Sequence, residues 1–166
     1  MLKLPKDVVA DPRHDALAAR LEASARPLWE QGRALVPEAA FNEALRAALA
    51  EALAEGDACQ GLEGAESALA IEQKGLDALR RKAPAAAPSP RASRLLFLAN
   101  DGSTRFYRDA EALLLRHADR LLGCRLAIDG DALGQALLGE PRLVRAVLVT
   151  DKRAAARALL ALLPEV

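Results

Sequence analysis

The chain has 166 residues, which is long enough to bury a hydrophobic core without disulfide bonds. Its formal net charge is zero, and its aromatic residues are one Trp, one Tyr and three Phe. This composition does not fit a strongly basic nucleic-acid-binding domain, and the few aromatics argue against a base-stacking platform for single strands. The abundance of Ala and Leu favours a helix-rich protein.

Neither the cysteines nor the apolar segments indicate a metal site, a disulfide-bonded protein or a membrane protein. Cys59 and Cys124 lie far apart, without a CxxC spacing or a neighbouring His, so neither a zinc site nor a disulfide framework is predicted. No apolar stretch is long enough for a signal peptide or a membrane span. We therefore expect a cytoplasmic protein without membrane contacts.

The N-terminal part is predicted to be helical. Residues 1–36 form an extension with one helix from about His14 to Ala25. The next helix is expected to begin at Pro37, because Pro is favoured at the first helical position. Its apolar face repeats every four residues, and it ends at Gly56.

The middle of the chain holds a short element, a helix and a Pro-rich segment. Residues 58–60 fit either a short strand or a turn, and the helix that follows ends near Lys82. Residues 83–93 contain three Pro and five Ala without a large apolar side chain, as in an exposed linker or surface loop. This segment is either a domain boundary or an insertion within one domain of residues 37–166. The insertion is favoured because neither flanking part looks self-sufficient.

Three short apolar runs characterise the second half. Each precedes an aspartate that opens a helical stretch, and the runs are 95–100 before Asp101, 125–128 before Asp129 and 143–150 before Asp151. Short apolar runs that alternate with helical segments predict buried strands covered by helices. The pattern therefore predicts an α/β fold with parallel strands.

The helices between these strands carry start and stop signals. Ser103 or Thr104 is predicted to cap a long helix that continues through His117 and ends at Gly123. Asp131 is predicted to open a short helix, and Asp151 to cap the last one. These residues and Asp101 form a set of expected helix caps at the strand ends.

The same aspartates have a second interpretation. Parallel strands would bring Asp101, Asp129 or Asp131, and Asp151 to one edge of the sheet, where converging carboxylates can hold Mg²⁺ for phosphoryl transfer. Capping explains each aspartate without a metal, because a carboxylate accepts the free N–H groups of a helix start. No Ser, Cys and His spacing supports nucleophilic catalysis. We therefore expect no metal, no cofactor and no enzymatic activity.

The second half resembles the kink-turn-binding ribosomal protein family, which also includes small bacterial RNA-binding modules. The resemblance is carried by LLFLAND at 95–101, DALGQALLGE at 131–140 and LVRAVLVTDKRAAARALLALL at 143–163. It covers residues 94–163 and extends to 37–82, with 83–93 as an insertion. It implies a three-layer α/β/α sandwich with a small, mostly parallel or mixed sheet.

The resemblance also implies association with RNA. The family reads RNA with a G-x-N-E-x-T-K segment, whereas residues 61–67 here read GLEGAES and lack the Asn and the Lys. Contact with structured RNA is therefore expected through shape and phosphates, without DNA specificity, from Arg105, Arg108, Arg142 and Arg145. Residues 84–166 hold eleven Arg and one Lys, although arginine also serves as an ordinary surface residue.

Two other functions remain open. The first is a protein-interaction or assembly module on the same fold that has lost RNA binding, which the neutral charge favours. The second and less favoured is a Mg²⁺-dependent phosphoryl-transfer enzyme.

Overall fold

A five-stranded mixed sheet forms the centre of the protein. The computed structural model describes residues 2–86 and 89–164. The strand order is β3 (Glu38–Ala39), β6 (Leu121–Leu126), β5 (Arg94–Leu98), β7 (Ala146–Val149) and β4 (Ala58–Gln60). Strands β3, β6 and β5 are parallel, whereas β7 is antiparallel to both of its neighbours.

The direction of β7 corrects the expectation of parallel strands. The chain leaves β6 through the short helix α6 (Gly130–Leu138) and enters β7 from the same end of the sheet. There the Arg145 carbonyl accepts the Ala99 N–H at 2.9 Å, just beyond the last residue of β5. Asp151 therefore lies at the opposite end from Asp101 and Asp129. The expectation that the three aspartates converge is wrong.

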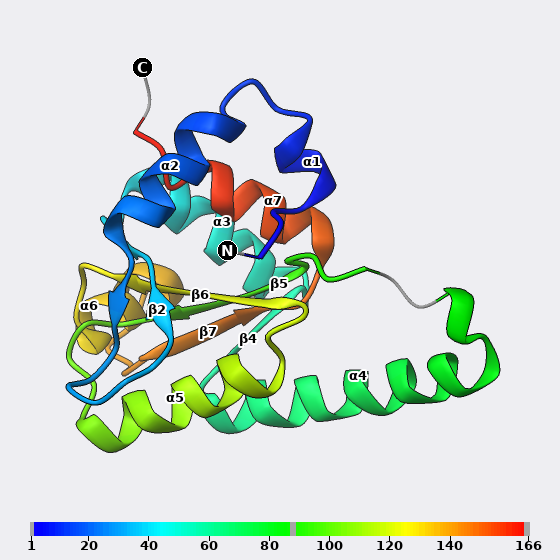
Figure 1. The fold of residues 1–166 in the computed structure, drawn as a ribbon. Coiled ribbons are helices and arrows are strands. Elements are labelled where there is room, and N and C mark those ends of the chain that lie inside the picture. Colours follow the sequence, from blue (N-terminus) through cyan, green and yellow to red (C-terminus); the bar gives the residue numbers. More distant parts are fainter. Residues whose placement is uncertain (1, 87–88, 165–166) are drawn as a thin grey trace.

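Helices cover both faces of the sheet, which confirms the α/β fold as a three-layer arrangement (Figure 1). One face carries α1 (Lys6–Val9), α2 (His14–Ser24), α3 (Glu43–Ala54), α6 and α7 (Lys152–Leu160). The other face carries α4 (Leu62–Lys82) and α5 (Thr104–Arg116), beside a hairpin of β1 (Arg26–Pro27) and β2 (Leu35–Val36). Helix α4 extends past the sheet.

Strand β5 shows why its sequence is a continuous apolar run. Leu95 and Phe97 point into the core beneath α3 and α7, while Leu96 and Leu98 point into the core beneath α4 and α5. All four side chains are buried. A strand buried on both faces loses the alternation of polar and apolar residues.

The N-terminal segment packs against the same sandwich. Leu4, Val8, Leu17 and Leu21 are buried in the core on the α3 face. The expected helix from His14 is present as α2, and the β1–β2 hairpin follows it. No sequence pattern predicts this hairpin, because each of its strands has only two residues.

Helix α3 begins later than predicted, because its cap lies at Asn42. The Asn42 side chain accepts the Leu45 N–H at 2.8 Å. Glu38 and Ala39, expected in the first turn, instead form β3 and pair with β6. The expected start at Pro37 is therefore wrong.

Helix α5 ends at Arg116, and the chain enters β6 at Leu121. Gly123 lies within the strand rather than at the end of a helix. A Cβ there would come within 2.9 Å of the Leu114 methyl groups, so glycine allows α5 to approach the sheet. The predicted helix extended to Gly123 because the leucine at the start of β6, Leu121, is buried and happens to continue the helical spacing of α5.

The segment between α4 and β5 contains a 3₁₀ turn (η1, Pro84–Ala86), and part of it, residues 87–88, lies outside the described residues. The C-terminal end of this segment is hydrogen-bonded to the N-terminal residues of the chain. The Ala92 N–H donates to the Lys3 carbonyl at 2.7 Å, and Ala92 is buried. No helix of the described residues is long and apolar enough to cross a membrane.

Candidate functional site

The predicted arginines lie where β5 and β6 end and β7 begins. Arg105 and Arg108 are exposed near the start of α5, and Arg142 is exposed in the connection between α6 and β7. Arg145 is partly buried just before β7. We call this set, Arg105, Arg108, Arg142 and Arg145, the arginine end.

Asp101 links three segments at the arginine end and does not cap the helix that follows it, α5, whose cap is Ser103; it accepts instead the N–H of Gly130, the first residue of α6. Its carboxylate accepts the Gly130 N–H at 2.9 Å and the Arg145 guanidinium at 3.3 and 3.5 Å. Burial raises the pKa of Asp101, but the hydrogen bonds from Arg145 and Gly130 outweigh that effect and hold the pKa below its usual value. Arg145 is therefore neutralised, which leaves three of the four predicted arginines without a carboxylate partner in the described residues.

Three helices have side-chain caps near the strand ends. Ser103 accepts the Phe106 N–H at the start of α5, and Asp151 accepts the Ala154 N–H at the start of α7. At α6 the cap is Asp129, which accepts the Ala132 N–H at 2.8 Å. Asp131, the predicted cap, lies inside the first turn, because the helix begins at Gly130 and its cap is two residues before Asp131.

Backbone packing fixes the segments that carry these arginines. A Cβ on Gly134 of α6 would lie 1.4 Å from the Arg142 carbonyl oxygen, so only glycine lets the helix approach this segment. The buried Tyr107 hydroxyl donates to the Ala99 carbonyl at 2.6 Å and accepts the Gly102 N–H at 3.1 Å. The loop from β5 to α5 is therefore held from inside.

A cavity of about 660 Å³ opens at the same end, beyond β3 and β6. Its polar lining includes Arg20, Arg26, Asn100 and Arg125. Arg125 is paired with Glu38, whereas no carboxylate of the described residues pairs with Arg20 or Arg26. Sequence reasoning missed these two arginines because nothing in the N-terminal segment signals that it reaches this end of the sheet.

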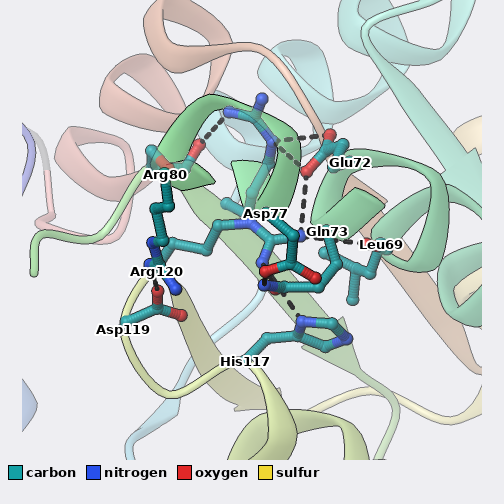
Figure 2. A network of polar contacts seen from close by, with 10 residues as sticks. Leu69, Glu72, Gln73, Asp77, Arg80, His117, Asp119 and Arg120 are labelled. Carbon is teal, nitrogen blue, oxygen red and sulfur yellow. Dashed lines mark hydrogen bonds and ion pairs between the residues drawn. The ribbon is translucent and has the colours of Figure 1, made fainter. Parts of the chain in front are cut away.

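A second polar centre surrounds Arg120 (Figure 2). It lies at the opposite end of the sheet, because Arg120 immediately precedes β6. Arg120 is only 7% exposed. Its guanidinium donates to the Leu69 carbonyl at 3.0 Å and to the Gln73 side chain at 3.1 Å, both on α4. It also lies 3.4 Å from the Glu72 carboxylate. The Arg120 Nε is the one buried side-chain nitrogen or oxygen of the described residues that has no hydrogen-bond partner.

Glu72 also accepts Arg94, at the start of β5, at 2.9 and 3.1 Å. Close by, Arg80 pairs with Asp119 at 3.1 Å. These contacts join the second half of α4 to β5 and to the turn before β6. We call Glu72, Arg94 and Arg120 the Glu72 network.

His117 is a neutral member of this centre. Its Nδ1 lies 3.1 Å from an Arg120 guanidinium nitrogen, and because arginine can only donate, Nδ1 accepts and the ring proton is on Nε2. Burial lowers the pKa of His117, and the nearby charges of Arg120 and Arg116 lower it further. His117 thus stays uncharged at neutral pH.

A cavity of about 730 Å³ adjoins the Glu72 network. Its lining comes from α4, from residues 89–94 and from the starts of α1, β6 and α7. We call it the network cavity. No local sequence pattern predicts this cavity, because its residues come from segments far apart in the chain.

The cysteines and acidic residues do not form a chemical centre in the part of the chain that the structure describes. No three His, Cys, Asp or Glu side chains gather there as a metal site. Cys59 and Cys124 are free thiols, and burial raises the pKa of Cys124 to about 12. Cys124 is therefore protonated and unreactive at neutral pH.

Comparison with known proteins adds no identification. No protein-family model matches this chain, and no curated protein is significantly similar to it.

Proposed function

We propose that the protein is a non-enzymatic, RNA-associated protein that contacts structured RNA through the arginine end. The observation that supports this proposal is the exposure of Arg105, Arg108 and Arg142 at one end of the sheet. Arg20 and Arg26 add two further guanidinium groups at the cavity of that end. A resemblance to ribosomal modules favours the same function.

Arginine suits this role because its planar fork donates two parallel hydrogen bonds to a phosphate. Arg145 positions the segment through Asp101, while the three exposed arginines contact the ligand. A-form RNA presents phosphates and 2′-hydroxyl groups across a wide minor groove, and proteins recognise it mostly by shape. If these three side chains each neutralise one phosphate, affinity must fall steeply with salt, because bound counterions are released.

The proposal is tested by fluorescence anisotropy with a labelled, structured RNA at low salt. The triple variant Arg105→Gln, Arg108→Gln, Arg142→Gln is expected to weaken binding by about tenfold or more. A hydrogen bond to a charged group contributes about 1.5 to 3 kcal/mol, and about 1.4 kcal/mol of binding free energy corresponds to a tenfold change in affinity. The matched control removes three exposed cations of α4, by Lys74→Gln, Arg81→Gln and Lys82→Gln. It is expected to bind nearly as well as the parent.

Two results contradict the proposal. One is the absence of any RNA binding by the parent protein at low salt, where phosphate contacts are strongest. The other is an equal loss of affinity in the triple variant and in its matched control.

Self-assembly is the second candidate, and a different surface favours it. Ile71 is 72% exposed and Leu79 is 43% exposed on α4, which extends past the sheet (Figure 1). A formal net charge of zero reduces repulsion between copies. Light scattering would then give twice the monomer mass, and Ile71→Lys would restore the monomer.

A further inference from the structure

We propose that the network cavity binds a phosphorylated small molecule of nucleotide size, at a site separate from the arginine end. Four observations support this: the charge of the lining, the fixation of two of its arginines, the size of the cavity and its apolar wall.

The lining of the cavity has a large excess of positive charge. Seven cationic side chains and three carboxylates border it. Two of the carboxylates are already engaged, Glu72 by Arg94 and Arg120 and Asp119 by Arg80. The third carboxylate, Asp7, has no ion pair in the described residues, and neither do four of the cations, which are Lys6, Arg91, Lys152 and Arg153.

Cations gathered in a concave site concentrate the field that attracts an anion. The low-dielectric walls of a cleft focus field lines and raise the local concentration of an oppositely charged ligand. The excess of four positive charges in the lining matches a ligand with several negative charges better than a single carboxylate. A di- or triphosphate provides such a charge.

Two of these cations, Arg91 and Arg94, are held in place by the fold, whereas Lys6, Lys152 and Arg153 are exposed. Arg91 donates to the Leu4 carbonyl at 2.7 Å, which fixes the N-terminal segment beside the start of β5 and brings Lys6 to the cavity. Glu72 fixes Arg94, whose side chain is only 19% exposed. Lys152 and Arg153 occupy the first turn of α7. Preorganised cations lose little conformational entropy when a ligand binds.

The size and the wall of the cavity favour an organic ligand over an inorganic ion. A volume of about 730 Å³ lies within the range of about 300 to 1,000 Å³ that is typical of small-molecule sites. Leu76 and Pro90, which also line the cavity, are not buried and give it apolar wall area. Phosphate alone leaves this wall uncovered, whereas the sugar and base of a nucleotide cover it.

The site is independent of the proposed RNA surface. Arg94 opens β5 and Lys152 follows β7, so both lie at the end of the sheet opposite to Asp101 and Arg145. Failure of RNA binding at the arginine end therefore does not affect this proposal, and the two are separated by variants at opposite ends.

Isothermal titration calorimetry on the full chain tests the proposal at low salt. The probes are ATP with EDTA, pyrophosphate, inorganic phosphate and adenosine. ATP is expected to bind most tightly and pyrophosphate more weakly, and adenosine is expected to give no heat at the same concentration. A bound ligand also raises the melting temperature, because it binds only the folded state.

Matched variants locate the site. Lys152→Gln with Arg153→Gln is expected to weaken ATP binding by about tenfold or more, because two charged contacts are lost. The control Lys74→Gln with Arg157→Gln removes two exposed cations that do not line the cavity, and it should bind ATP like the parent. Arg105→Gln with Arg108→Gln should also leave ATP binding unchanged. All six positions are exposed, so circular dichroism should show unchanged folding.

Several results would overturn the proposal. The absence of heat with both ATP and pyrophosphate excludes a polyphosphate site. Equal affinity for ATP and pyrophosphate would show that the sugar and base of the nucleotide do not contribute to binding. A loss of ATP binding in the control equal to that in the Lys152 and Arg153 variant excludes this cavity. Binding of structured RNA that depends on Lys152 and Arg153, without ATP binding, assigns the cations to an RNA backbone instead.

Discussion

The two ends of the central sheet use arginine in opposite ways. At the arginine end, Arg105, Arg108 and Arg142 are exposed, and the segments that carry them are fixed by backbone contacts. At the opposite end, Arg94 and Arg120 are largely buried, and they themselves join α4 to the sheet. Arg105, Arg108 and Arg142 thus face the solvent at one end, whereas Arg94 and Arg120 hold the structure together at the other.

The difference follows from the partners that surround each guanidinium. The Arg145–Asp101 pair keeps about a third of each side chain exposed, where solvent screens the attraction. Arg120 keeps 9% of its side chain exposed and donates to a backbone carbonyl and a side-chain amide. Removing a buried, hydrogen-bonded group leaves its partners unsatisfied, so the same substitution must cost more at this end.

The largest expected effect concerns the backbone packing of the arginine end. Gly134→Ala places a methyl group 1.4 Å from the Arg142 carbonyl oxygen, so α6 must shift away from this segment. We expect the free energy of unfolding to fall by about 3 kcal/mol or more, measured by urea denaturation.

A matched glycine provides the control for this substitution. Gly75 lies inside α4, and a Cβ there meets nothing within 4 Å. Gly75→Ala is expected to stabilise the protein by about 0.5 to 1 kcal/mol, because alanine has the higher helix propensity. Similar free-energy changes at the two glycines would contradict the packing described for α6.

The second effect compares one arginine from each end. Arg120→Met removes hydrogen bonds to Leu69 and Gln73 and is expected to destabilise the protein by about 2 kcal/mol. Arg145→Met removes a partly exposed ion pair and is expected to cost less than about 1 kcal/mol. Urea denaturation of both variants at neutral pH measures the difference. Equal losses would show that burial does not distinguish the two ends.

The third prediction uses pH to test the Glu72 network. The native pKa of His117 is depressed, so below about pH 6.5 the unfolded chain takes up a proton that the folded protein does not bind. Stability is therefore complete above this pH and falls as the pH decreases toward the native pKa, by at most about 1.4 kcal/mol per pH unit.

Urea denaturation at pH 7.5, 6.5 and 5.5 measures this dependence. His117→Gln removes the titrating group and should flatten it. A parent stability that stays constant or rises on acidification over this range would show that His117 is not held neutral.

The smallest effect separates the two aspartates at the start of α6. Asp129→Ala is expected to destabilise by about 1 kcal/mol, because the side chain accepts the Ala132 N–H. Asp131→Ala loses only a favourable interaction with the helix dipole, of about 0.3 to 1 kcal/mol. Thermal melting of both variants compares the two positions. A larger loss at Asp131 would contradict the observed cap.

The architecture was predictable because it depends on short-range patterns. The apolar run at Leu95–Leu98 predicted a buried strand, and the structure has it as β5, with side chains in the cores on both faces. The caps at Ser103 and Asp151 involve residues only three positions away. The late start of α3 was missed because pairing of Glu38 with β6 requires a partner far along the chain.

The candidate sites were less predictable than the fold. Arg105 and Arg108, which the sequence predicts as RNA contacts, are exposed in the structure, but the pairing of Arg145 with Asp101 could not be predicted. The network cavity was missed entirely, because Lys6, Arg94 and Lys152 are brought together only by the sheet and its covering helices.

The sequence by itself determined the succession of helices and strands, because hydrophobic periodicity and capping act within a few residues. Tertiary structure alone decided the direction of β7, since that depends on where the chain re-enters the sheet after α6. It also decided the burial of Arg120, whose partner Leu69 lies 51 residues earlier in the chain. A charged residue is buried only where distant segments supply its hydrogen-bond partners, and no local pattern records them.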